Sequence, residues 1–175
     1  MFVLLNGSFG IGKSTVADLL VGRVANARLY DPERAGHVLR RLPAFLLGRT
    51  QQPVDYQDLA QWRWLTQRGC VWSHRSASAV VVPMAFTNLG YFEDLQLYLG
   101  RVAPVLPLCL VAPIAVVEQR LQRRAAAEGR AVTEFETRRS RECCVAHADP
   151  RFGRPVDATR APTLIVGQIA SLIDP

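Results

Sequence analysis

The stretch LLNGSFGIGKSTVADLL, residues 4–20, contains the pattern GxxxxGK[ST] from Gly7 to Ser14 without a mismatch. The apolar run FVLL precedes this pattern and a helical pattern follows it, which is the strand–loop–helix context in which the pattern binds phosphate. Its glycines allow positive φ and let successive backbone N–H groups point into one concavity. The stretch therefore predicts a phosphate-binding loop between a buried strand and a helix.

Two side chains of this loop suit nucleotide chemistry. Lys13, the only lysine in the chain, is expected to reach the β- and γ-phosphates, and the Ser14 hydroxyl is expected to ligate Mg²⁺. The positive end of the following helix dipole favours the same anion. The predicted cofactors are ATP and Mg²⁺, although the loop does not distinguish ATP from GTP. The predicted nucleotide contacts are Gly7, Ser8, Phe9, Gly10, Ile11, Gly12, Lys13, Ser14 and Thr15.

The composition favours one globular domain over residues 1–175. Of the 175 residues 49% are hydrophobic, and the sequence contains no repeat and no apolar run long enough to span a membrane. The net charge of +6 comes from scattered arginines, so no nucleic-acid partner is expected. The four cysteines lack metal-binding spacing, and the N-terminal sequence MFVLLNG lacks the features of a signal peptide. Reduced thiols and a cytoplasmic location are therefore predicted.

Strand-like and helix-like segments alternate along the chain. Apolar strands separated by helices favour a parallel sheet with helices on both faces, which is a three-layer α/β/α domain. The predicted strands span 2–6, 28–31, 79–83, 106–111 and 154–158. The predicted helices span 13–25, 32–41, 55–72, 91–99, 114–127, 134–147 and 162–173.

A carboxylate stands at the end of the second predicted strand. Ligands of such sheets bind beyond the carboxyl ends of the strands, so Asp31 is placed to accept a proton from an acceptor hydroxyl. Glu33 would assist or coordinate Mg²⁺ through water. The third predicted strand ends without an aspartate, so Asp31 or Glu33 is expected to support the metal. Alternatively, Asp31 followed by Pro32 is a helix N-cap, a role compatible with catalysis.

Arginines gather between residues 120 and 141. Arg120 and Arg124 lie four residues apart on one helix face, and after a glycine-containing turn Arg138, Arg139 and Arg141 follow. Two arginine-bearing arms joined by a turn predict a lid over the phosphates, where an arginine contributes about 10³–10⁵ in rate. The alternative is a solvated helix hairpin with ordinary surface charge.

The segment DYQDLAQWRWL, residues 55–65, is a candidate for holding the phosphate acceptor. Its amide, aromatic and basic side chains suit a small-molecule pocket together with the segment that ends the third strand. The two tryptophans of the segment are equally compatible with the core. The candidate acceptor contacts are Glu33, Gln57, Trp62, Arg63 and Met84.

The ordered set of motifs resembles the tunicamycin-resistance proteins of the TmrB type, within the small phosphate-loop kinases. The residues that carry the resemblance are NGSFGIGKST (6–15), YDPE (30–33), DYQ (55–57), WR (62–63), VPM (82–84), YF (91–92) and RLQRR (120–124). The resemblance implies a nucleoside-monophosphate-kinase-like core, a P-loop NTPase fold with a five-stranded parallel sheet in the order 2-3-1-4-5. It also implies ATP-dependent transfer to a hydroxyl of a small molecule, in relatives an antibiotic with a sugar or nucleoside moiety. Asp31 matches the base, and Arg120 and Arg124 match the first lid arm.

Two other functions remain open at this point. A nucleotide-gated protein could sequester its ligand without chemistry, and a metabolic kinase could use a nucleoside, nucleotide or sugar acid, because the fold alone does not select an acceptor. The tail APTLIVGQIASLID, residues 161–174, suits a helix packed on the sheet or an amphipathic helix that touches a membrane.

Overall fold

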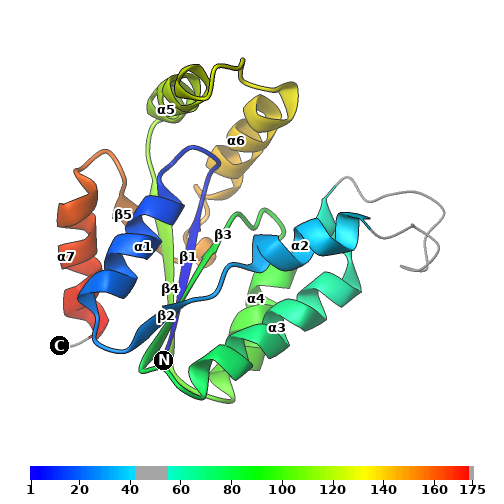
Figure 1. The fold of residues 1–175 in the computed structure, drawn as a ribbon, viewed down its shortest axis with the longest axis vertical. Helices are drawn as coiled ribbons and strands as arrows, with labels where there is room; N and C mark the ends of the chain where they lie inside the picture. The colour runs from blue at the N-terminus through cyan, green and yellow to red at the C-terminus, as the bar shows by residue number, and fades with distance from the viewer. Residues whose placement is uncertain (42–54, 174–175) are drawn as a thin grey trace.

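The computed structural model describes residues 1–41 and 55–173 (Figure 1). Its centre is a parallel five-stranded sheet in the order β2-β3-β1-β4-β5, so the predicted strand order is confirmed. The carboxyl ends of the strands point toward one edge of the molecule, where the loops that follow them converge. The strands are β1 (Phe2–Gly7), β2 (Ala27–Leu29), β3 (Ala79–Met84), β4 (Val105–Val111) and β5 (Arg154–Asp157).

Helices cover both faces of this sheet. One face carries α1 (Lys13–Arg23) and α7 (Pro162–Ile173), and the other carries α2 (Pro32–Arg41), α3 (Ala60–His74) and α4 (Leu89–Gly100) (Figure 1). A hairpin of α5 (Ile114–Ala127) and α6 (Glu134–Ala146) extends beyond the carboxyl ends of the strands. Two short 3₁₀ turns, η2 (Tyr56–Asp58) and η3 (Pro150–Phe152), complete the described elements. The three-layer arrangement agrees with the prediction from the alternating segments.

The central strand explains why the apolar runs are continuous. Every residue of β1 is buried, and its side chains alternate between two cores. Val3 and Leu5 contribute to the core beneath α1 and α7, whereas Phe2 and Leu4 contribute to the core beneath α3 and α4. Burying such a side chain contributes about 1.5–3 kcal/mol relative to exposing it. A strand covered on both faces therefore needs apolar residues at successive positions rather than at alternate ones.

The C-terminal segment, for which a helix packed on the sheet and a membrane-touching helix were the alternatives, forms helix α7. Ile165, Val166 and Ile169 are buried in the core that α7 shares with α1. Burial of this apolar stripe is what a helix packed on the sheet requires. Among the residues that the structure describes, no helix is both long and apolar enough to cross a bilayer.

Several predicted boundaries differ from the observed ones, most of them by one or two residues, and two of the differences have a clear local cause. The second strand ends at Leu29 rather than at residue 31, because Asp31 instead caps the following helix. The predicted helix 55–72 is divided, since Asp55 Oδ1 accepts a hydrogen bond from Gln57 N at 2.9 Å and closes the turn η2. Leu59 then has ψ of 120°, an extended value, so α3 begins only at Ala60. Side-chain capping of this kind competes with a continuous helix.

Gly69 allows α3 to pack closely against Tyr30. A Cβ built at Gly69 lies 2.2 Å from Tyr30 Oη, whose hydroxyl donates to Leu65 O at 3.1 Å. We expect Gly69→Ala to lower the free energy of unfolding by about 1–3 kcal/mol, because the ring must move. Gly22→Ala on α1 is the control, since its Cβ meets nothing within 4 Å, and it should stabilise by about 0.5–1 kcal/mol. Urea denaturation checks both; equal effects of the two variants would contradict the expectation.

Candidate active site

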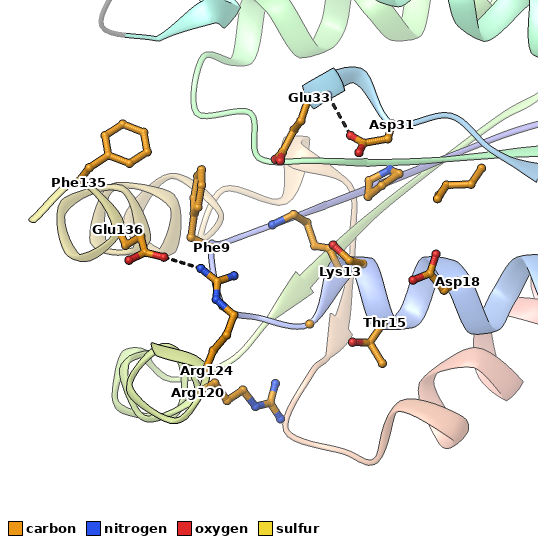
Figure 2. Close-up of a pocket in the computed structure, with 15 residues that line it drawn as sticks. Phe9, Lys13, Thr15, Asp18, Asp31, Glu33, Arg120, Arg124, Phe135 and Glu136 are labelled. Carbon is orange, nitrogen blue, oxygen red and sulfur yellow. Dashed lines mark hydrogen bonds and ion pairs between the residues drawn. The ribbon is translucent and has the colours of Figure 1, made fainter. Parts of the chain in front are cut away.

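A cavity of about 710 Å³ lies at the carboxyl ends of the strands, beneath the α5–α6 hairpin (Figure 2). Its volume falls within the range of roughly 300–1,000 Å³ that is usual for ligand sites. Parallel α/β sheets bind their ligands at this edge. The residues that line it are Phe9, Gly10, Gly12, Lys13, Ser14, Thr15, Asp18, Leu29, Asp31, Glu33, Pro83, Arg120, Arg124, Phe135 and Glu136.

The phosphate-binding loop forms one wall of this first cavity. Gly10 and Gly12 have φ of 75° and 105°, in the left-handed region that favours glycine. A Cβ at Gly10 would also lie 2.6 Å from Leu121 Cγ, so the close approach of α5 requires glycine there. Helix α1 begins at Lys13 with Gly12 as its N-cap and without a side-chain cap, which leaves its first N–H groups for a ligand.

Lys13 projects from the loop into the first cavity (Figure 2). Its Nζ donates to Ser8 O at 2.8 Å and lies 5.5 Å from the centroid of the Phe9 ring. Desolvation lowers the pKa of Lys13, and the nearby negative charge of Glu33 opposes that change. A desolvated ammonium group is stabilised by a close anion. Lys13 is therefore placed to pair with a phosphate oxygen.

Three of the predicted nucleotide contacts, Gly7, Ser8 and Ile11, are not among the residues that line the first cavity. Gly7 ends β1, and both Ser8 and Ile11 are almost fully buried. Ser8 Oγ donates to the carbonyl of Ser140 on α6 at 3.1 Å, so it ties the loop to the hairpin. These residues support the shape of the loop, whereas the other six predicted contacts line the cavity.

Asp31 and Glu33 face Lys13 across the first cavity (Figure 2). Asp31 Oδ1 accepts a hydrogen bond from Glu33 N at 2.9 Å, so Asp31 also serves as the N-cap of α2. Both predicted roles of Asp31 therefore fit the same position, because capping occupies one carboxylate oxygen. Its second oxygen is available to a hydroxyl group in the cavity.

The acidic residues of the first cavity suit a magnesium ion that is coordinated mainly by nucleotide phosphates and water. Within residues 1–41 and 55–173 there is no group of three or more His, Cys, Asp or Glu side chains that could hold a metal. Ser14, Asp18, Asp31 and Glu33 nevertheless line one cavity. Mg²⁺ commonly binds through one or two protein oxygens, substrate phosphates and water. These residues therefore fit Mg²⁺ that arrives with a nucleotide.

The predicted lid arginines both line the first cavity, in different surroundings. Arg120 Nη1 donates to Ile11 O at 2.9 Å, which joins α5 to the phosphate-binding loop. Arg124 donates from Nη2 to Glu136 on α6, and its side chain is 48% exposed. Arg120 thus stabilises the loop, and Arg124 is the more exposed of the two cations. Arg120 and Arg124 of α5 and Phe135 and Glu136 of α6 line the cavity, so the hairpin forms one of its walls.

Glu136 was not expected to belong to this site. Hydrogen bonds from Arg130 are the main cause that lowers its pKa to about 2, and Thr133 completes a capping box with it. The sequence contains the signal for the cap, since Thr133 and Glu136 have the T-x-x-E spacing. Asp18 was also missed, although it follows Ser14 by four residues and so shares its helix face.

None of the acceptor candidates from the third strand and α3 segment reaches the first cavity. Trp62 is 1% exposed and its Nε1 donates to Pro32 O at 2.9 Å, and Met84 is 2% exposed, so both belong to the core. Arg63 stacks 4.1 Å from the centroid of the Tyr91 ring and donates from Nη1 to Gln57 O at 2.8 Å. The core alternative therefore describes Trp62 correctly. Glu33 alone among the acceptor candidates lines the first cavity.

A second cavity of about 500 Å³ adjoins the first, and Phe135 lines both. Buried Arg139 lies in its wall, with Nη2 2.7 Å from Asp55 Oδ2 and Nη1 2.8 Å from Glu142 Oε2. Of the predicted acceptor contacts, Gln57 is the one that lines this second cavity, among the residues that the structure describes. The residues that line it are Asp55, Gln57, Asp58, Thr87, Asn88, Tyr91, Phe135, Arg138, Arg139 and Glu142.

The sheet order, the phosphate-binding loop and the hairpin together define a P-loop fold of the small-kinase type. No protein-family model matches the chain, and a search of curated proteins finds no match. The solved structure of the Deinococcus radiodurans tunicamycin resistance protein shares the fold with a TM-score of 0.74 and 24% identity. That match covers 98% of this chain and 94% of the other.

Two kinases of solved structure share the fold as well. A gluconokinase from Sinorhizobium meliloti has a TM-score of 0.66 at 16% identity over 98% of this chain and 90% of its own. Shikimate kinase from Acinetobacter baumannii, solved with shikimate, has a TM-score of 0.63 at 17% identity over 98% and 92%. At these identities the likeness shows a shared fold. The predicted resemblance to the tunicamycin-resistance proteins is confirmed at that level.

Proposed function

We propose that this protein is an ATP- and Mg²⁺-dependent phosphotransferase that moves the γ-phosphoryl group to a hydroxyl of a small molecule. The observation that carries the proposal is one cavity with the Lys13 ammonium group and the loop N–H groups on one side and the Asp31 carboxylate on the other. Phosphoryl transfer needs a bound triphosphate, charge neutralisation and an oriented acceptor. This cavity offers residues for each requirement.

In the proposed step, the acceptor oxygen attacks the γ-phosphorus while the bond to the oxygen that bridges the β- and γ-phosphates breaks. The hydroxyl proton passes to Asp31, and ADP leaves with the electron pair of the broken bond. Lys13 and the N-terminus of α1 neutralise the phosphate charge, and Arg124 can reach the same oxygens from the hairpin. Bound Mg²⁺ would add positive charge at the phosphates, with Ser14 as its protein ligand.

The second cavity is the proposed acceptor site. It adjoins the phosphate-binding cavity, and Thr87 and Asn88 supply partners for hydroxyl groups while Tyr91 and Phe135 supply aromatic surfaces. The charge of Arg139 is already compensated by Asp55 and Glu142. Arg138, the other arginine of this cavity, also pairs with Glu142, at 3.6 Å, so a carboxylate ligand would compete with acids that are already present. The site therefore favours an uncharged, hydroxyl-rich acceptor over a sugar acid.

The identity of the acceptor is proposed by analogy. The name of the Deinococcus protein connects this fold with tunicamycin resistance, so a nucleoside-type antibiotic such as tunicamycin is the first candidate. The names of the gluconokinase and the shikimate kinase connect the fold with acidic acceptors. The compensated charge of Arg139 favours the antibiotic or another uncharged nucleoside or sugar.

Mass spectrometry after incubation with Mg·ATP tests the proposal directly. Tunicamycin, uridine and the matched pair gluconate and glucitol are each incubated with the protein, and ADP release is followed in parallel. We expect one uncharged compound to gain a phosphoryl group and the acid to gain none. An unchanged ligand that is retained only with ATP would indicate a binding protein without chemistry. Phosphorylation of gluconate but not glucitol would contradict the role given to Arg139.

A further inference from the structure

The α5–α6 hairpin contains a carboxylate with two arginine partners. Arg124 Nη2 donates to Glu136 Oε1, while Arg130 donates from Nη1 to Oε2 at 2.8 Å and from Nη2 to Oε1 at 2.9 Å. Thr133 N adds a hydrogen bond to Oε2 at 3.0 Å. Arg130 alone therefore satisfies both carboxylate oxygens in the bidentate geometry that makes strong pairs.

Of the two arginines that pair with Glu136, only Arg124 lines the first cavity. Arg124 and Glu136 both line the first cavity, and Figure 2 shows their contact beside the loop residue Phe9. Arg130 lies on the turn between the helices and is not among the residues that line this cavity. The Glu136 side chain is only 11% exposed, whereas that of Arg124 is 48% exposed. Arg124 also lies 3.7 Å through Nε from Glu128 Oε1, an exposed i,i+4 pair that is weak. Arg124 therefore has solvent around it and room for other rotamers, whereas Glu136 is enclosed.

Separating Arg124 from Glu136 would ordinarily be unfavourable. A poorly exposed carboxylate that loses its cation is left uncompensated, and breaking such a pair is strongly destabilising. The bidentate pair with Arg130 removes most of this penalty, since Glu136 stays neutralised when Arg124 departs. The lowered pKa of Glu136, about 2, means that the group is ionised at neutral pH and can hold both arginines.

We propose that Glu136 holds Arg124 beside the first cavity while it is empty, and that Arg130 lets Arg124 transfer to the phosphoryl oxygens of a bound nucleotide. Glu136 and Arg130 are positioning residues in this mechanism, because they act through Arg124. The proposal rests on the proposed function, which supplies the nucleotide. It predicts that removing Arg130, although it lies outside the cavity, weakens nucleotide binding.

Calorimetric titration with the magnesium complex of a non-hydrolysable ATP analogue provides the test. In Arg130→Ala, Arg124 becomes the remaining arginine partner of Glu136 and is retained there, so affinity is expected to fall about tenfold, the scale of one charged hydrogen bond. Adding Glu136→Gln should return the affinity to within about threefold of wild type, because a neutral amide holds Arg124 weakly. Glutamine preserves the capping box with Thr133. Rescue by a second substitution is not expected from a purely structural role.

Arg123→Ala is the matched control, since it removes one exposed arginine from α5 with the same change in net charge. Its affinity should stay within about twofold of wild type, as for an exposed charge. Arg130→Gln replaces the alanine variant if thermal unfolding shows that the latter does not fold. Binding by Arg130→Ala equal to that of Arg123→Ala, or a double variant as weak as Arg130→Ala, would overturn the proposal. No uptake by the wild type would instead refute the proposed function itself.

Discussion

Lys13→Met is expected to abolish measurable MgATP binding and to lower phosphoryl transfer by roughly three orders of magnitude or more. The reason is the position of the ammonium group, which lines the first cavity and is held 2.8 Å from Ser8 O. Methionine has a similar length but offers no charge to the phosphates. Calorimetry with MgATP and ADP release in the presence of an acceptor measure the two effects.

The stability of the same variant separates loss of function from loss of fold. Burial lowers the pKa of Lys13, which means that the native state disfavours its charged form. Replacing it with an uncharged side chain is therefore expected to leave the free energy of unfolding unchanged or to raise it slightly. A destabilised Lys13→Met protein, or one that still binds MgATP as the wild type does, would contradict the assignment of Lys13.

Asp31→Asn is expected to lower turnover by about 10²-fold or more, with little change in the dissociation constant for MgATP. Asparagine keeps the Oδ1 acceptor that caps Glu33 N, so helix α2 retains its N-cap while the proton acceptor is lost. Steady-state kinetics with the acceptor identified by mass spectrometry, together with calorimetry, measure the separation of turnover from binding.

Asp31→Ala extends this comparison to the second role of the residue. Alanine removes both the base and the cap, so it should match asparagine in turnover but lose about 1 kcal/mol more stability. Equal turnover of wild type and Asp31→Asn would show that Asp31 only caps α2. Glu33, which lines the same cavity, would then be the next candidate for the base.

Those features of the fold that depend on local pattern could be predicted from the sequence. The loop from Gly7 to Ser14 has a fixed spacing, and strands buried on both faces have continuous apolar runs, so these patterns predicted the three-layer architecture. The strand order came from the resemblance to the small phosphate-loop kinases, and the sheet confirms it. The end of β2 and the start of α3 were predicted incorrectly, because single hydrogen bonds accepted by Asp31 Oδ1 and Asp55 Oδ1 decide them. Of these two caps, the sequence indicated only the one formed by Asp31 and Pro32. Hydrophobic periodicity contains no information about such caps.

Only part of the candidate site could be predicted from the sequence. Lys13, Asp31, Arg120 and Arg124 were predicted to meet at one place, and they line one cavity, although their catalytic roles stay predictions. Trp62 was considered for the acceptor pocket, but whether a tryptophan faces a core or a cavity depends on how its helix packs. The second cavity could not be predicted, because it is assembled from three segments that are far apart in the sequence.

Helix α6 contacts more of the active region than a simple lid would. It is tied to the phosphate-binding loop through Ser8 and Ser140, and it presents Glu136 to the first cavity and Arg139 to the second. If the two cavities bind nucleotide and acceptor as proposed, α6 is common to both sites, and any coupling of their occupancies through it must be mutual. Filling either cavity should therefore change the affinity of the other by the same factor, so that one helix would make the two binding events cooperative.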